Sequence, residues 1–220
     1  MTRFLRPLLV ALLLLPAGCQ VLGIAANAMP KPPVPAKVVL AGNTVGVMVW
    51  CDRGLRIDWP SLQKDLANGV QVRIAEAVKA KAKEVAGVSF PFPVESFIRW
   101  QKDHPGSEAQ PITSVAAQLR ESRITRLIYV EVQSLSTRSS SAMALYRGTA
   151  TASLKVIAIE PDATVGKIIY EEPNIRVVFP KHSTDDGRAE GNDNHMYAGT
   201  MTFLADAIAK RFVEHPAEDD

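Results

Sequence analysis

The sequence predicts one α/β domain in which a sheet of mixed parallel and antiparallel strands is packed by helices. Three observations predict this fold class. A buried strand followed by an amphipathic helix opens the domain, the apolar period becomes alternating in the second half, and 220 residues suffice for one core. We expect the domain to occupy residues 38–213, after a segment that does not belong to the core.

The first strand and the first helix are the most clearly marked elements. Residues 45–50 form a continuous apolar run with several β-branched side chains, bounded by glycines, which is typical of a buried strand. Pro60 can open a helix, and apolar residues then recur at every fourth position with charged residues between them. This pattern predicts an amphipathic helix over residues 60–83.

The middle of the chain predicts shorter elements. Residues 88–92 predict a short strand, and Pro91 within it favours an edge position. Residues 94–103 and 113–122 predict two short helices, because a run with prolines and a glycine separates them.

The second half predicts an antiparallel meander and a closing helix. Residues 127–135 and 149–158 alternate apolar and polar side chains, as half-buried antiparallel strands do. A turn at residues 162–166 leads into a further extended stretch over residues 168–179. A last helix carries an apolar stripe formed by Tyr197, Met201, Leu204, Ile208 and Phe212.

The first 18 residues predict an export signal. Arg3 and Arg6 precede an apolar stretch over residues 8–15. This stretch is much shorter than the roughly 20 residues that a membrane-spanning helix needs, and small residues follow it. A basic start, a short apolar stretch and small residues are typical of a segment that directs export and is then removed.

The end of this segment resembles the lipobox of bacterial lipoproteins. Residues 16–19 (PAGC) place small residues before Cys19, although a proline stands where that motif usually has leucine. The resemblance implies that Cys19 is acylated and becomes the new amino terminus. The alternative is a secreted protein that begins at Met29, because Ala26 and Ala28 fit the small-x-small rule of ordinary signal peptidase.

Lipidation at Cys19 would anchor the protein, because palmitate and the other acyl chains of a lipoprotein together hold a chain durably on a bilayer. Gln20 after the cysteine resembles an outer-membrane address, which predicts a location on the outer membrane facing the periplasm. Residues 19–37 predict a tether, since four prolines lie within residues 29–37. Residues 214–220 predict an acidic tail.

Charge and cysteine content exclude other classes of protein. The formal net charge is +2, and both excess charges, Arg3 and Arg6, lie in the export signal. The balance argues against a nucleic-acid partner. Two cysteines cannot form a disulfide scaffold, so Cys51 is expected to be a buried structural thiol, with an intermolecular disulfide as the alternative.

Several segments together resemble a group of envelope proteins. Residues 124–132 (ITRLIYVEV), 148–157 (GTATASLKVI) and 162–170 (DATVGKIIY) are similar to strands and a turn of this group, and they follow a lipobox, an opening strand at residues 44–50 and a long helix. The group includes the curli-secretion channel lipoprotein, the lipoprotein activators of penicillin-binding proteins, and the amino-terminal domain of TolB. The similarity covers about residues 44–213.

The resemblance implies a non-enzymatic protein that binds or regulates another envelope protein. The secretion channel builds its pore from long hairpins inserted between strands. Here only residues 138–143 connect two of the predicted strands, which argues against a pore.

Catalytic motifs are missing from the sequence, and one polar loop is the only dense group of candidate ligands. Neither a Gly-x-Ser-x-Gly elbow, a phosphate-binding loop nor a His-Glu-x-x-His helix occurs. The loop at residues 181–195 contains Asp185, Asp186 and His195, and oxygen-rich loops can hold calcium or, with histidines, a transition metal. We expect a solvated loop instead, and therefore no catalytic, cofactor-binding or metal-ligating residues.

Lys79, Lys81 and Lys83 form a basic helix end. Complementing the helix dipole suffices to explain them, with a contact to anionic lipid as the alternative.

The sequence thus predicts an envelope lipoprotein that binds or regulates another envelope protein, in secretion or in cell-wall synthesis, and that can form a homo-oligomer. Two alternatives stay open. One is a periplasmic enzyme that uses the loop at residues 181–195, and the other is an oligomeric secretion-channel subunit.

Overall fold

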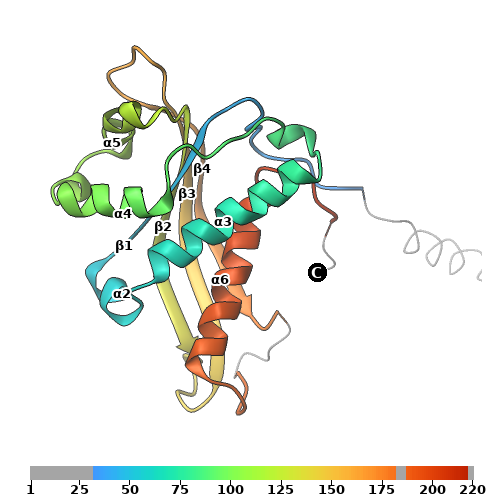
Figure 1. The fold of residues 1–220 in the computed structure, drawn as a ribbon. Helices are drawn as coiled ribbons and strands as arrows, with labels where there is room; N and C mark the ends of the chain where they lie inside the picture. Colours follow the sequence, from blue (N-terminus) through green and yellow to red (C-terminus); the bar gives the residue numbers. More distant parts are fainter. Residues whose placement is uncertain (1–31, 182–186, 218–220) are drawn as a thin grey trace, which may run out of the picture. The chain divides into compact units, whose positions relative to one another are not determined.

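A four-stranded sheet lies at the centre of the fold (Figure 1). The computed structural model describes residues 32–181 and 187–217. Residues 35–214 belong to one compact unit. A second unit contains the segments on either side, and in it Val34 and His215 form an antiparallel bridge.

The sheet has the order β1-β2-β3-β4 and mixes both strand directions, which confirms the predicted fold class. β1 (Val45–Cys51) pairs in parallel with β2 (Arg126–Arg138). β2 pairs antiparallel with β3 (Tyr146–Ala158), and β3 pairs antiparallel with β4 (Lys167–Phe179). The three strands of the meander have 13 residues each and extend beyond the predicted bounds.

Helices α3 (Leu62–Lys79) and α6 (Asp193–Ala209) pack on one face of the sheet (Figure 1). Their apolar stripes pack on alternate residues of the strands to form the main core. α6 lies so close to β3 that a Cβ atom at Gly148 would stand only 1.9 Å from Thr200 Oγ1. The stripe predicted for the last helix packs there, with Tyr197 only partly buried.

The opposite face is covered only in part. α4 (Val94–Asp103) and α5 (Ile112–Gln118) pack around Phe97 and Leu127, near the start of β1 and β2, and form a second apolar cluster. A 3₁₀ turn at Lys83–Val85 precedes α4, one at Ser107–Ala109 connects α4 to α5, and one at Leu119–Ser122 leads from α5 to β2. In the described parts of the chain, the far halves of β2, β3 and β4 receive no helix on this side (Figure 1).

Several local predictions were wrong. Residues 88–92 are not a strand, since only a single bridge joins Ser89 to Thr44; Gly87 at φ 72° turns the chain and Pro91 cannot donate to a ladder. α2 (Arg53–Asp58) was not predicted and is capped by Asp52, whose carboxylate accepts from Leu55 N.

The first long helix is also shorter than predicted. α3 ends at Lys79, before residue 83, because Lys81 adopts φ 60° and breaks the helical path. The helix predicted over residues 113–122 is α-helical only to Gln118 and ends as a 3₁₀ turn.

Both edges of the sheet are protected against pairing with another chain. At β1, the carbonyl of Val49 accepts from Gln63 Nε2 at 2.7 Å and from Gln101 Nε2 at 3.1 Å. β4 carries two register irregularities and Pro173, features that disfavour edge-to-edge association.

The predicted signal at residues 1–18 and Cys19 lie outside the described residues. Of the predicted tether, residues 32–37 are described, and Lys37 N donates to Arg211 O at 2.8 Å. Among residues 32–181 and 187–217, no helix has both the length and the hydropathy to cross a membrane.

Candidate functional site

The uncovered half of the sheet forms a groove of about 700 Å³, which we call the open groove. Strand alternation explains its polar character, because the apolar side chains of β2 and β3 point to the helices and the polar ones point away. Hydroxyl groups from both strands line it, namely those of Ser134, Ser136, Thr149 and Thr151. Gln133 and Asn174 add side-chain amides. The surface is therefore rich in hydrogen-bonding groups.

Three arginines give the open groove a positive character. Arg138, Arg147 and Arg176 come from β2, β3 and β4, and no carboxylate lines the groove within the described parts of the chain. Arg176 is exposed at the β4 side. A groove with guanidinium groups and without acids favours an acidic or strongly polar partner.

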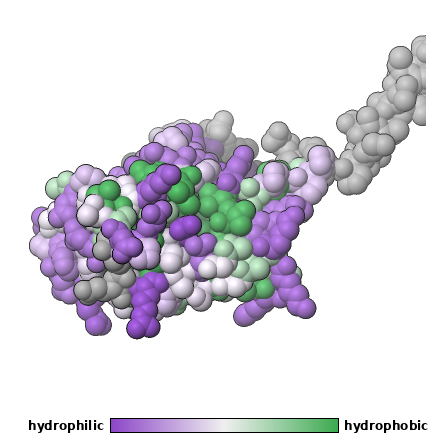
Figure 2. Space-filling model, turned by 90° about the horizontal axis from the view of Figure 1, so that it is seen from above, coloured by the Kyte–Doolittle hydropathy of each residue, from purple (hydrophilic) through white to green (hydrophobic). Residues whose placement is uncertain are grey.

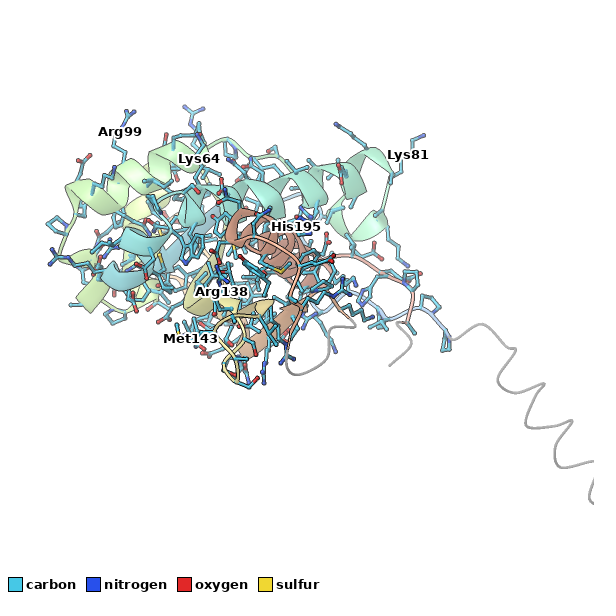
Figure 3. The ribbon with its side chains drawn as sticks, turned by 90° about the horizontal axis from the view of Figure 1, so that it is seen from below. Lys64, Lys81, Arg99, Arg138, Met143 and His195 are labelled. Carbon is cyan, nitrogen blue, oxygen red and sulfur yellow. The ribbon has the colours of Figure 1, made fainter. Side chains whose placement is uncertain are left out.

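Asp193 balances one of these charges. Its carboxylate accepts from Arg138 Nε at 3.0 Å and Arg138 Nη2 at 2.8 Å, and from the buried hydroxyl of Thr137 at 2.6 Å. The hydrogen bonds from Arg138, and then the one from Thr137, hold the pKa of Asp193 below its usual range. Arg138 also lies 3.9 Å from the ring centroid of Tyr146. These contacts fix Arg138 between the end of β2 and the start of α6 (Figure 3).

The β2–β3 turn forms the outer rim of the open groove. Ser139 N donates to Leu145 O at 2.9 Å, and the hydroxyls of Ser139 and Ser141 lie 2.9 Å apart. Met143 at the tip of the turn is 82% exposed. A flexible apolar side chain beside a polar groove is a common feature of protein-binding surfaces.

The polar loop predicted at residues 181–195 is only partly described, since Asp185 and Asp186 lie outside the described residues. The described part has a structural role. Asn192 caps α6 by accepting from His195 N at 2.8 Å, and the exposed His195 ring contacts Phe179 edge to face. Within residues 32–181 and 187–217, no three acidic, histidine or cysteine side chains come together as a metal site would require.

Cys51 is fully buried in the main core. Burial raises the pKa of this thiol to about 11, so the thiol remains protonated at neutral pH. It lies on the helix-covered face and does not line the open groove.

A second polar cluster joins α3 to α6. Ser61 Oγ and Tyr197 OH both donate to Asp65 Oδ2, at 2.6 and 2.8 Å, and the Tyr197 ring stacks on Trp59 at 4.8 Å. Burial raises the pKa of Tyr197 above its usual range. Because Asp65 already accepts a hydrogen bond from each hydroxyl, it is not a free base that could activate either of them. The cluster therefore holds the two helices together.

The open groove was not predicted from the sequence. The alternation of Thr149 and Thr151 with alanines showed which side chains point away from the core, and Arg147 continues that face. The missing information was that the helices leave this half of the face uncovered.

No protein-family model matches the sequence, and no curated protein matches it. Two structures of the PelC dodecamer from Paraburkholderia phytofirmans are similar at TM-score 0.41, with 7% and 9% identity. They cover 82% and 83% of this chain and 98% and 94% of their own. A protein described as a neuraminyllactose-binding hemagglutinin homolog from Helicobacter pylori has TM-score 0.35 and 10% identity, covering 82% of this chain and 90% of its own. None of these likenesses is close enough to carry an inference about function.

Proposed function

We propose that this protein is a non-enzymatic lipoprotein of the bacterial envelope that binds another envelope protein through the open groove. Cys19 carries the lipid anchor, and residues 19–37 connect the anchor to the folded domain. The membrane is the outer membrane, and the domain faces the periplasm. The observation that carries the binding role is the groove itself, with hydroxyls, amides and three arginines on the half of a sheet face that no helix of the described residues covers.

The groove suits binding better than chemistry. Ser134, Ser136, Thr149 and Thr151 line it, but among the described residues no histidine or carboxylate lines it beside them to act as a general base. Nor does any aromatic side chain of the described residues line it, on which a sugar ring could stack. Hydroxyls, amides and guanidinium groups instead match the carbonyls and carboxylates of a protein surface.

The partner should present an acidic segment to the groove. Arg138 is already neutralised by Asp193, so Arg176 at the β4 side is the charge with which such a segment would pair most directly. Interfaces with this character gain specificity and association rate from charge complementarity more than affinity.

The binding role is tested by site-specific photo-crosslinking in intact cells. A photo-reactive residue at Thr151 or at Ser136 samples the groove, and one at Val72, exposed on α3, samples the opposite side of the domain. We expect the same crosslinked protein from both groove positions and not from Val72. Arg176→Glu should remove that product. Equal crosslinking from Val72, or crosslinking insensitive to Arg176→Glu, would contradict the proposal.

The anchor is tested by fractionation. Cys19→Ala should move the protein from the membrane to the soluble fraction, whereas Cys51→Ala should leave it on the membrane. A Cys19→Ala protein that still fractionates with the membrane would overturn the anchoring part, and so would a mature protein that begins at Met29.

A further inference from the structure

One end of the sheet differs in surface chemistry from the end that carries the β2–β3 turn. β1, β2 and β4 begin there and β3 ends there, and residues 35–38 reach the domain at the same end through the bond from Lys37 N to Arg211 O. We call it the tether end. α3 also ends there, since Leu40 N, just before β1, donates to Glu84 O at 2.8 Å.

Exposed apolar side chains concentrate at the tether end. Four of the seven exposed large apolar residues in the described parts of the chain lie there, namely Val39 (61% exposed), Val165 (52%), Ile168 (37%) and Ile169 (42%). Figure 2 looks onto this end and shows hydrophobic side chains toward the middle of the face, with hydrophilic ones around them. Monomeric soluble domains seldom group exposed apolar side chains in this way without a partner.

Lysines accompany these apolar residues. Lys79, Lys81 and Lys83 are all exposed where α3 ends, and Lys81 projects away from the domain (Figure 3). Lys37 and Lys167 lie at the same end.

The three lysines where α3 ends outnumber the acidic residues beside them, the exposed Glu76 and the buried Glu84. Glu84 is 8% exposed and lies 3.9 Å from Lys83, and Glu172 is bound to Arg211. Three other acidic residues at this end are exposed, and none of the three lies on α3. Glu160 and Asp162 lie on the β3–β4 connection, and Glu214 follows α6.

We propose that the tether end rests on the surface of the membrane that carries the lipid of Cys19. This inference relies on the lipid anchor of the proposed function. Ile168 and Ile169 would lie at the level of the phospholipid headgroups, and the lysines at the end of α3 would contact anionic headgroups.

The predicted tether is so long that the anchor alone leaves the orientation of the domain on the membrane open. Fifteen residues separate Cys19 from Pro35, and an extended chain of that length spans up to about 50 Å. The anchor alone therefore does not fix which side of the domain faces the bilayer. Apolar and basic side chains at the end where the tether arrives would fix it, and they would turn the open groove, near the β2–β3 turn at the opposite end of β2 and β3, away from the membrane.

The orientation is tested with the full-length lipidated chain in vesicles of phosphatidylethanolamine and phosphatidylglycerol. An environment-sensitive dye is attached at Ile169→Cys, at Val165→Cys, or at Met143→Cys on the β2–β3 turn as a matched exposed control. Cys51 is buried and Cys19 is blocked by its lipid. Spin-labelled lipids should quench the dye at the two tether-end positions about twofold or more over that at Met143. Equal quenching at all three positions would overturn the inference.

Charge variants and salt separate lipid contact from mere proximity. Lys81→Glu or Lys83→Glu should reduce quenching at Ile169, whereas Arg53→Glu, a charge reversal at the other end of β1, should not. High salt and vesicles of phosphatidylcholine should reduce it as well. Quenching that is insensitive to all of these would overturn the role of the lysines.

Flotation distinguishes the two proposals. Wild-type protein isolated from cells that carries no lipid at Cys19 and does not float with the vesicles overturns the anchor. A chain that floats while its tether end stays unquenched overturns the orientation and leaves the anchor intact.

Discussion

Replacing Glu172 tests how β4 is fastened to the end of α6. The carboxylate accepts from Arg211 Nη2 at 2.6 Å and Arg211 Nε at 2.9 Å, and from the Tyr170 hydroxyl at 2.6 Å. The side chains of Glu172 and Arg211 are 26% and 24% exposed, so solvent screens this pair less than it screens a surface ion pair. Glu172→Gln keeps the shape but removes the charge and one of the two acceptor oxygens.

The expected loss follows from the bonds removed. A hydrogen bond to a charged group contributes about 1.5–3 kcal/mol, and the amide preserves part of it, so Glu172→Gln should lower the free energy of unfolding by about 1–2 kcal/mol. Glu172→Ala should cost about 2–3 kcal/mol, because the Arg211 guanidinium and the Tyr170 hydroxyl both lose their acceptor. Glu171→Gln is the matched control, since Glu171 is 49% exposed and pairs only with Lys155, and it should change stability by less than about 0.5 kcal/mol.

The pH dependence gives an independent check. Hydrogen bonds from Arg211 lower the pKa of Glu172 below its ordinary 4.5. A carboxyl with a lowered pKa stabilises the fold above its unfolded pKa, and this contribution is lost as the pH falls through the folded value. The difference between wild type and Glu172→Gln should therefore be present at pH 7 and shrink in acid.

Urea unfolding followed by circular dichroism, with the lipidated chain in detergent, measures both effects. A Glu172→Gln protein within about 0.5 kcal/mol of wild type at pH 7 would refute the reasoning. A stability difference that does not shrink in acid would refute it as well.

Three further predictions concern packing and the thiol. Gly148→Ala should lower stability by about 1–3 kcal/mol, because its Cβ would collide with α6, while Gly106→Ala, which meets nothing within 4 Å, should not; thermal unfolding of both variants decides this. Phe97→Ala should lower stability by about 3–5 kcal/mol in urea unfolding, since the ring is 2% exposed in the second core, and a smaller loss would mean that α4 can detach. Native Cys51, whose pKa is raised to about 11, should resist a thiol reagent at pH 8 and react after unfolding, and rapid labelling of the native protein would contradict its burial.

The strands and helices with a clear apolar period were predicted well, and those without one were not. β1 and α4 were predicted almost to the residue, because continuous apolar runs and amphipathic periods directly report burial. α2 was missed, since it is six residues long and contains no buried side chain. Its start depends on one cap by Asp52, which a periodicity cannot show.

The candidate site was less accessible from sequence than the fold. The loop at residues 181–195 attracted attention because its polar residues are contiguous, whereas the arginines of the open groove come from three different strands. Arg147 and Arg176 line the same groove because β3 pairs with β4 and their register places Thr151 opposite Arg176. That register depends on the tertiary packing of both strands.

The sequence by itself predicted the export segment and the lipid attachment at Cys19, and it determined which side of each strand is apolar, because these properties depend on consecutive residues. The tertiary structure alone decided what those faces become. α3 and α6 pack on one face and form the main core, whereas α4 and α5 reach only half of the other face. That difference depends on how far each helix extends over strands distant in the sequence, and it produces the open groove.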